Sequence, residues 1–418
     1  RERGRGGERV SASHPAAAAS DGAGWRARAE RAVAAAASTG SKRPHALFGV
    51  DAAADAPLHY VRASGCRLTT VDGRTLVDLT MALGAVAFGY ADPEVTARAH
   101  AAALAGHVAG LSHPSEVALA ERLCDAVACA ERALFVKSGA EAVAAAVRLA
   151  RTATGRDVVV CSGYFGWLDW CSDAAGVPAG ARADVVRVPH DDVDALVAAA
   201  DAAGARLAAI VLEPVVERLP SSGWLAAARR ACDRHGAVLV LDEIKTGARL
   251  HLAGHHATGD VVPDLAVYGK AIANGWPLAA VVGRAAVMDA ARRTWISSTL
   301  AGEGTALAAA HAVLDRHAQE DVPAALARTG AALRAAVDDA LLASGVAGVR
   351  TEGLAPMWFL RFDHPARETR FLAAARDAGV LFKRGAYAYA ALAHDAAAVA
   401  AVAAAAAAGF AALRAADG

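Results

Sequence analysis

Aromatic residues, net charge and paired cysteines are all scarce in this chain of 418 residues. Tryptophan, tyrosine and phenylalanine make up 5% of it, although 55% of the residues are hydrophobic, because much of the apolar content is alanine. Basic and acidic residues balance at 43 each, so we expect no basic surface that attracts nucleic acid. The six cysteines form no CxxC pair and no metal-ligand spacing, which predicts reduced thiols in a cytoplasmic protein.

We also expect no membrane span, no signal peptide and no metal site. The Ala/Val stretch Ala396–Ala408 is shorter and richer in alanine than the ~18-residue apolar run of a membrane span, so we interpret it as a helix packed on the protein surface. The first residues lack the apolar core of a signal peptide. The pair His255-His256 has no Cys, Glu or His partner at ligand spacing, which predicts a surface loop.

The length of the chain allows two domains with a large core. Arg1–Gly24 is rich in Arg, Gly, Ser and Ala and has almost no large apolar residue, so we predict a disordered tail. We expect residues 25–74 to begin a small domain, residues 75–310 to form a large domain and residues 311–418 to complete the small one.

The N-terminal third is predicted to contain helices and one hairpin. The expected helices are Trp25–Ser38, Pro93–Ala109 and Ser115–Ala128, the last capped by Ser115. Between the first two, Leu58–Asp78 reads as two short strands around the Asp-Gly turn Val71–Arg74.

From Ala133 onward, short apolar runs alternate with helical segments, which predicts an α/β fold with a mostly parallel seven-stranded sheet covered on both faces. The strand candidates are Ala133–Val136, Asp157–Cys161, Val185–Val188, Leu207–Leu212, Ala237–Leu241, Leu265–Tyr268 and Ala279–Val282. After residue 306 the pattern predicts a smaller α+β domain. Its expected elements are helices at Ala306–His317, Pro323–Ser344 and Arg367–Ala378, strands at Gly348–Glu352, Met357–Phe362 and Val380–Phe382, and the alanine-rich C-terminal helix.

Two of the predicted strands end in ionisable residues. Ala237–Leu241 is followed by Asp242, and Leu265–Tyr268 is followed by Gly269 and Lys270. Open α/β sheets bind ligands at these strand ends. A carboxylate and a lysine there suit pyridoxal phosphate (PLP), which has a basic ring nitrogen and an aldehyde. Taken alone, each residue could also have no role in function, since a strand often ends in Asp and a lysine after a strand is often a solvated surface group.

Two further turns could serve the same cofactor. Ser138, Gly139 and Ala140 follow a strand and open a helix, which makes an anion site, although an ordinary capped helix is the commoner reading of such a turn. Tyr164 lies between glycines at another strand end, where it could lie flat on a cofactor ring or simply cover the core.

Six segments in order resemble the class III, fold-type I PLP-dependent aminotransferases, in the branch that includes glutamate-1-semialdehyde aminomutase and aminotransferases of specialised and sugar metabolism. The resemblance covers nearly the whole chain from about Ser41. The segments are SGAEA at 138–142, GYFGW at 163–167, LEP at 212–214, DEIKTGARL at 242–250, DLAVYGKAIANG at 264–275 and SSTLAGEG at 297–304.

The resemblance implies roles for single residues. Lys270 would hold PLP as a Schiff base, Asp242 would pair with the ring nitrogen, and Ile244 and Tyr164 would cover the two ring faces. Ser138, Gly139 and Ala140 would hold the phosphate together with Thr299 of a neighbouring subunit. A homodimer with shared active sites, and Glu213 on the substrate side, follow from the same likeness.

Four positions depart from the aminomutase pattern. Phe165 replaces a histidine, Leu83 replaces a tryptophan, Lys245 stands where Met or Gln is usual, and Glu303-Gly304 replaces Asn-Pro. Because these positions belong to stretches that shape the substrate side in the family, the departures favour another substrate pair. Lys245 and Arg384 are the candidates for the donor's carboxylate, and either could instead be a solvated cation.

The resemblance therefore predicts an aminotransferase that moves an amino group from an amino-acid donor to a carbonyl of a small biosynthetic intermediate in specialised metabolism. An isomerase with the same cofactor, either an aminomutase or an amino-acid epimerase, is the alternative. A third hypothesis is a PLP-binding regulator or scaffold without turnover, which the intact Lys270, Asp242 and Tyr164 disfavour.

Overall fold

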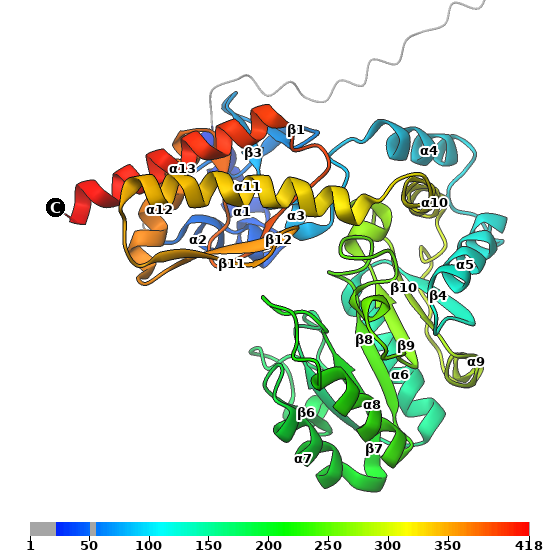
Figure 1. Cartoon of the computed structure of the whole chain (residues 1–418). Coiled ribbons are helices and arrows are strands. Elements are labelled where there is room, and N and C mark those ends of the chain that lie inside the picture. The colour runs from blue at the N-terminus through cyan, green and yellow to red at the C-terminus, as the bar shows by residue number, and fades with distance from the viewer. Residues whose placement is uncertain (1–21, 51–55, 418) are drawn as a thin grey trace, which may run out of the picture.

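The computed structural model describes residues 22–50 and 56–417, and its largest sheet, in the lower part of Figure 1, has seven strands. The strand order is β4-β10-β9-β8-β7-β5-β6. Strands β5 to β9 pair in parallel, and β10 runs antiparallel to both β9 and β4. The bounds are β4 Arg132–Val136, β5 Val158–Ser162, β6 Val185–Arg187, β7 Leu207–Leu212, β8 Val238–Asp242, β9 Leu265–Tyr268 and β10 Ala279–Gly283. The predicted α/β fold with a mostly parallel seven-stranded sheet is confirmed.

Helices cover this sheet, and we call the sheet with its helices the large-sheet region. The helices are α4 Pro93–Leu104, α5 Pro114–Ala126, α6 Gly139–Thr154, α7 Val193–Ala203, α8 Trp224–His235, α9 Ala285–Met288 and α10 Gly304–Gln319. Strands β5, β7, β8, β9 and β10 are buried at every residue, as expected of a sheet covered on both faces.

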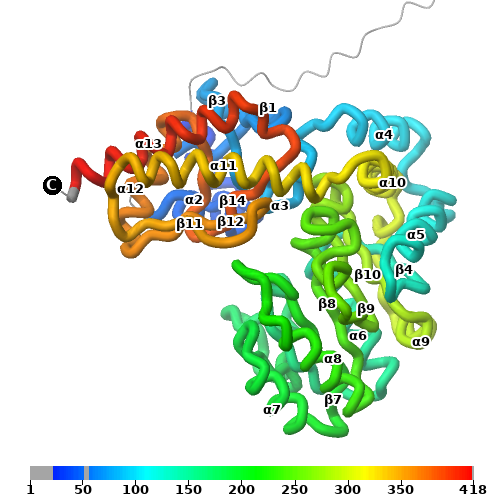
Figure 2. Tube along the Cα trace, viewed as in Figure 1, coloured from blue at the N-terminus to red at the C-terminus, as the bar shows by residue number. Residues whose placement is uncertain are grey.

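The two ends of the chain meet in a second body, which we call the small-sheet region. Its first sheet joins β1 Tyr60–Ser64, β2 Arg67–Thr70 and β3 Thr75–Asp78 to β13 Val380–Leu381, and its second joins β11 Val349–Leu354, β12 Met357–Phe362 and β14 Ala388–Tyr389. Its helices are α1 Gly22–Ala32, α2 Pro44–Phe48, α3 Met81–Gly84, α11 Val322–Ser344, α12 Pro365–Asp377 and α13 Ala396–Asp417. Since β13 pairs with β3 in parallel, segments some 300 residues apart lie side by side (Figure 2).

Several predicted boundaries in the N-terminal third were wrong. Gly22–Gly24 belong to α1, while the rest of the predicted tail lies outside the described residues. Helix α1 ends at Ala32 because Val33 has extended backbone angles, φ −116° and ψ 125°. Leu58–Asp78, predicted as two strands, contains three, because a turn with Gly65 at φ 57° divides the part before Val71 into β1 and β2. Helix α5 is capped by His113 instead of Ser115: Pro114 starts the helix and the His113 ring accepts a hydrogen bond from the Ser115 N–H.

The expectation that the chain has no apolar run long enough for a membrane span was wrong for helix α13. Ala396–Ala416 is long and apolar enough to cross a membrane by length and composition, a test that core helices of other folds also pass. One face of α13 is packed: Ala398, Val402, Phe410 and Leu413 are buried in the cluster that α11 and α12 also line.

Two buried polar side chains fasten the chain before α4 to the large-sheet region. Arg249 is fully buried and donates to the carbonyls of Gly84 (3.1 Å) and Ala390 (2.7 Å). Asn274 accepts from the N–H groups of Ala87 and Phe88, both at 2.9 Å. Asn274 follows Lys270 by four residues, so this anchor also fixes the loop that carries the lysine.

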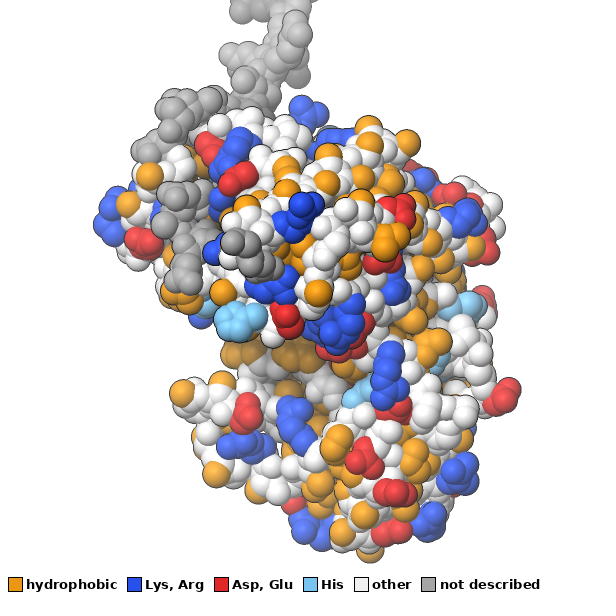
Figure 3. All heavy atoms as spheres, turned by 60° about the vertical axis from the view of Figure 1, so that its left-hand side comes forward, with side chains coloured by type: hydrophobic (Ala, Val, Ile, Leu, Met, Phe, Trp, Pro, Cys, Tyr) orange, Lys and Arg blue, Asp and Glu red, His pale blue; other side chains and the backbone are white. Residues whose placement is uncertain are grey.

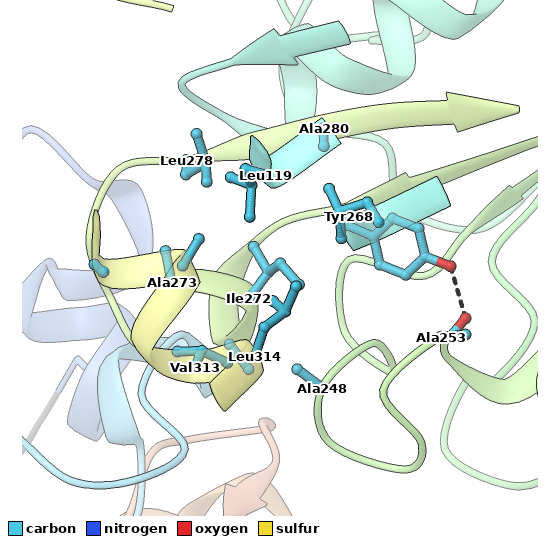
Figure 4. Packing of buried hydrophobic residues seen from close by; sticks show 14 of the residues in the cluster. Leu119, Ala248, Ala253, Tyr268, Ile272, Ala273, Leu278, Ala280, Val313 and Leu314 are labelled. Carbon is cyan, nitrogen blue, oxygen red and sulfur yellow. Dashed lines mark hydrogen bonds between the residues drawn. The ribbon is translucent and has the colours of Figure 1, made fainter. Parts of the chain in front are cut away.

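The strand β9 and the turn after it rest on an apolar cluster (Figure 4). Ile272, Leu278 and Leu314 pack there, and the Tyr268 hydroxyl donates to the Ala253 carbonyl at 2.7 Å. A buried tyrosine needs such a partner, and the bond ties β9 to the loop after β8.

Candidate active site

Asp242 and Lys270 lie at the ends of the neighbouring strands β8 and β9. Asp242 is the last residue of β8, in register with Val267 of β9, and Lys270 follows Gly269 just beyond β9. Lys270 has φ 49°, a left-handed conformation that is strained for a residue with a side chain. The parallel register and this strained turn bring a carboxylate and an amine to one edge of the sheet.

Burial changes the ionisation of both groups. Desolvation, followed by the nearby charge of Glu213, raises the pKa of Asp242 to about 7, although its carboxylate accepts a hydrogen bond from the Ile244 N–H at 3.0 Å. Burial lowers the pKa of the Lys270 amine from its ordinary value. The site therefore favours a neutral amine, the form that reacts with an aldehyde.

A cavity of about 270 Å³ opens beside these two residues. Its lining comes from the start of α6, the loop after β5 and the ends of β7, β8 and β9: Ser138, Gly139, Ala140, Tyr164, Phe165, Gly166, Trp167, Glu213, Asp242, Ile244, Lys245 and Lys270. Twelve residues from five segments of the sequence thus converge on one space, and ten of them are site residues predicted from the sequence.

The start of α6 is built for close approach. Ser138 and Glu141 form a capping box, in which the Ser138 hydroxyl is bound to the Glu141 carboxylate at 2.8 Å. A side chain on Gly139 would meet Ile244 Cδ1 at 2.6 Å, so only glycine lets Ile244 lie over this turn. The first-turn N–H groups of a helix lack helical acceptors, which suits an anion.

The loop after β5 forms the opposite wall. Tyr164 lines the cavity but is 75% exposed, so the cavity is open on that side. Phe165 is buried and packs against Trp170, with ring centroids 5.9 Å apart. Gly166 has φ 93° and lies so close to Ala140 that a Cβ would approach the alanine Cβ to 2.4 Å, which holds the loop against the start of α6.

An ion pair occupies the remaining side. The Lys245 amine contacts the Glu213 carboxylate, whose other oxygen accepts from the Tyr164 N–H at 3.1 Å. Tyr387, from the segment before β14, places its hydroxyl 3.0 Å from the Lys245 amine. Sequence reasoning missed Tyr387, because a tyrosine 142 residues further along the chain carries no local signal of this contact.

Four predicted site residues lie outside the cavity lining. Thr299 is in an exposed loop and Leu83 is in the left-handed turn α3. Glu303 caps α10, accepts from the Ala306 N–H at 3.0 Å and pairs with Lys137 at 3.0 Å, so its carboxylate is already engaged. Arg384 is held by α12, 3.7 Å from the Glu368 carboxylate.

Glu243, next to Asp242, has a structural role. It is fully buried and accepts from the N–H groups of His255 (2.8 Å) and His256 (2.9 Å) and from the His256 ring (2.9 Å). The expectation of a surface loop was therefore wrong for His256, which is buried against this carboxylate. In the described ranges no group of three or more His, Cys, Asp or Glu residues could hold a metal ion.

The donor set fits PLP. A lysine with a lowered pKa suits the aldehyde, a buried carboxylate suits the ring nitrogen, and a helix start suits the phosphate. Ile244, in the loop after β8, and Tyr164, in the loop after β5, both border the space between these three groups. Every part of the cofactor thus has a matching residue in one cavity.

Comparisons with known proteins agree with this chemistry. The family model of the class-III aminotransferases matches residues 50–390. The glutamate-1-semialdehyde 2,1-aminomutase of Symbiobacterium thermophilum is 36% identical over 328 residues, 71% of this chain and 72% of that protein. The 2'-deamino-2'-hydroxyneamine transaminase of Streptomyces kanamyceticus is 35% identical over 310 residues, 73% of this chain and 78% of that protein.

Solved structures show the same fold. The FumI protein of Sphingopyxis sp. MTA144, solved with PLP, has a TM-score of 0.88 and 28% identity and covers 94% of this chain and 96% of its own. A transaminase with PLP bound has a TM-score of 0.84 and 24% identity, covering 93% and 96%.

Asp242→Ala is expected to leave the fold intact and to lower the rate of amine reaction by at least roughly 100-fold, because the ring nitrogen loses its buried counter-ion. Circular dichroism would report the fold, and the absorbance change of the PLP-loaded protein with an amine would report the rate. Asp242→Asn, which keeps the shape, should be similarly impaired. An alanine variant that reacts at nearly the wild-type rate would show that Asp242 has another role.

Proposed function

This chain belongs to the class-III aminotransferase family, and from that premise we propose that amino-group transfer runs through Lys270 and Asp242 in the cavity described above. The enzyme is PLP-dependent, with an amino donor and a carbonyl acceptor as its substrates. The observation that carries the assignment of residues is the buried lysine at the end of β9 beside the buried aspartate at the end of β8.

Bound PLP supplies an aldehyde that joins to amines and a ring that draws electrons from the attached carbon. Because burial lowers the pKa of the Lys270 amine, Nζ gives up its proton more readily than an exposed lysine, so it could bind the cofactor and, when a donor amine takes its place, act as a base. Nζ then removes the proton from the donor carbon and later returns a proton as an acid. The Asp242 carboxylate would accept a hydrogen bond from the protonated ring nitrogen of bound PLP and offset its positive charge.

The remaining cofactor contacts are proposed from the lining of the cavity. Ser138, Gly139 and Ala140 would hold the phosphate at the start of α6, where backbone N–H groups attract anions. Ile244 would cover one ring face and Tyr164 the other. The exposure of Tyr164 in the single chain supports a site that closes only when further atoms are present.

We propose that these atoms come from a second copy of the chain. Large apolar side chains are exposed together near α4, α5 and the loop that carries Thr299, namely Leu104, Val108, Leu111, Val117 and Leu300. The loop lies against the 107–116 segment, since the Gly304 N–H donates to the His107 carbonyl at 2.7 Å. A homodimer would cover this patch and bring Thr299 to the partner's phosphate, as the resemblance predicts.

The substrates are proposed from the pocket. Phe165, which lines the cavity, replaces the histidine of the aminomutase pattern, whereas Leu83 and Glu303 lie outside the lining. An amino acid as donor with a hydroxylated or amine-bearing carbonyl acceptor is our expectation. One relative is named for a hydroxylated substrate, 2'-deamino-2'-hydroxyneamine, which supports this class. A cytoplasmic enzyme of specialised biosynthesis agrees with the reduced cysteines and with that relative.

An isomerase remains the second candidate, because the Symbiobacterium thermophilum relative is an aminomutase at 36% identity. Both reactions need the same lysine, carboxylate and phosphate contacts. They differ in whether a second carbonyl substrate takes the amino group, so the cofactor contacts alone do not separate them.

We expect the PLP-loaded protein to lose its cofactor absorbance with an amino-acid donor and to regain it only when a carbonyl acceptor is added. Spectra of single turnovers, followed by identification of both products, would measure this. An isomerase would need no acceptor. Conversion of glutamate-1-semialdehyde to 5-aminolevulinate at roughly 1 s⁻¹ or more, within the usual enzyme range, would contradict the aminotransferase proposal.

A mixed-dimer experiment tests the shared site. Thr299→Glu should repel the phosphate of the partner's site, and Lys270→Ala should inactivate its own site. Mixed dimers of the two variants contain one site with both native residues, so about a quarter to a half of the wild-type activity should return. The exposed neighbour Ser297 provides the control, since Ser297→Glu should leave the activity unchanged. An active, monodisperse monomer in light scattering would refute the shared site.

A further inference from the structure

The Lys245–Glu213 ion pair lies inside the proposed active site and is not among the groups proposed to hold the cofactor. Its side chains are only 7% and 12% exposed, and both border the cavity. Apart from Lys270, Lys245 is the one lysine or arginine among the cavity-lining residues that the structure describes. If Lys270 holds the cofactor, a substrate anion in this cavity has one basic side chain of the lining left to bind, Lys245, and that side chain is already paired with the Glu213 carboxylate.

Tyr387 completes the pair from the small-sheet region. Its hydroxyl accepts from the Lys245 amine at 3.0 Å and from the Glu217 N–H at 2.7 Å, and the amine lies 4.7 Å from the centre of its ring. Within the described part of the chain this hydroxyl donates to no acceptor, so its proton is available to a substrate oxygen. Tyr387 is held in place by Phe359, with ring centroids 4.0 Å apart.

The energetics of buried charge decide what such a pair can do. Burial alone would lower the pKa of the Lys245 amine, but Glu213 and Tyr387 raise it above its ordinary value, so the amine stays charged. Removing one partner of a buried pair is strongly destabilising, because the other charge is left uncompensated. A ligand can separate the pair only if it supplies a charge that replaces the lost partner. A substrate carboxylate supplies the negative charge that Lys245 needs.

Glu213 is prepared for such an exchange. One of its oxygens accepts from the Tyr164 N–H, a contact that does not depend on Lys245. When a substrate carboxylate takes Lys245, Glu213 keeps this bond and gains a free oxygen for a hydroxyl or ammonium group. With the substrate bound, Lys245 is paired with the substrate carboxylate, and Glu213 is held by the Tyr164 N–H until a substrate hydroxyl or ammonium group takes its free oxygen.

We propose that Lys245 binds the carboxylate of the amino-acid donor in exchange for Glu213, with Tyr387 donating a second hydrogen bond, and that the pair re-forms around an acceptor without a carboxylate at that place. The inference rests on the proposed function and names its substrate class. The donor presents one carboxylate to this side of the cavity, and the acceptor presents hydroxyl or amine groups instead.

The test compares donors with and without a carboxylate. The PLP-loaded protein is mixed with an ordinary amino acid that reacts, and separately with its decarboxylated amine, and the second-order rate constant of the absorbance change is measured for each. Lys245→Gln should lower the ratio of the two rate constants at least 10-fold, and Tyr387→Phe should lower it less. Glu213→Gln should raise the ratio, because Lys245 loses its internal competitor.

Lys245→Gln and Glu213→Gln are expected to change the ratio in opposite directions, which separates recognition of the carboxylate from a purely structural role. Lys383→Gln makes the same chemical change outside the cavity and should leave the ratio unchanged. If Lys245→Gln slows both donors equally, or if Glu213→Gln lowers the ratio, the exchange is refuted. If the wild-type protein reacts with neither donor of any pair, the proposed amino transfer itself fails, which is a different result.

Discussion

The structure depends on burying a carboxylate and an amine at the ends of two adjacent parallel strands. Strand pairing fixes Asp242 opposite Val267, and the left-handed backbone at Lys270 then turns the chain at the sheet edge. Neighbouring polar groups serve this arrangement. Glu243 ties down the loop after β8, and Asn274 ties the loop after Lys270 to residues 87–89. The strain and the desolvation at Lys270 persist because so many separate contacts hold the turn.

The parts of the fold that follow from local sequence were predictable. β7 and β9 have the predicted bounds, because a short continuous apolar run is typical of a strand that is buried on both faces of a parallel sheet. The strand ends then located Asp242 and Lys270, and the Ser-Gly turn located the start of α6. Each of these rests on a few consecutive residues and on the rule that ligands bind at strand ends.

The rest depends on contacts between distant segments, which a single sequence does not display. Tyr387 reaches Lys245 from the far end of the chain, and the short strand β14 exists only through its pairing with β12. Glu303 looked like a pocket carboxylate, but it caps α10 and binds Lys137. α13 packs one face within its region although its composition resembles a membrane span. In each case contacts between distant segments, and not the local sequence, decide what the residue or element contacts.

The space between the two regions gives the site its substrate side. Figure 3 shows the molecule hollowed between its upper and lower parts, with hydrophobic and charged side chains around the opening. The large-sheet region supplies the residues proposed to hold the cofactor, whereas Tyr387 brings the small-sheet region to the Lys245–Glu213 pair. Cofactor binding and substrate choice are thus proposed for different residues in and beside one cavity.

The most direct test of this account is to identify which lysine binds PLP. The chain has five lysines, and two of them, Lys245 and Lys270, line the same cavity. Borohydride reduction of the PLP-loaded protein, followed by peptide mapping, should place the label on Lys270, whose pKa is lowered by burial, and leave Lys245 unlabelled because Glu213 keeps it charged. A label on Lys245 or on any lysine other than Lys270 would contradict the account.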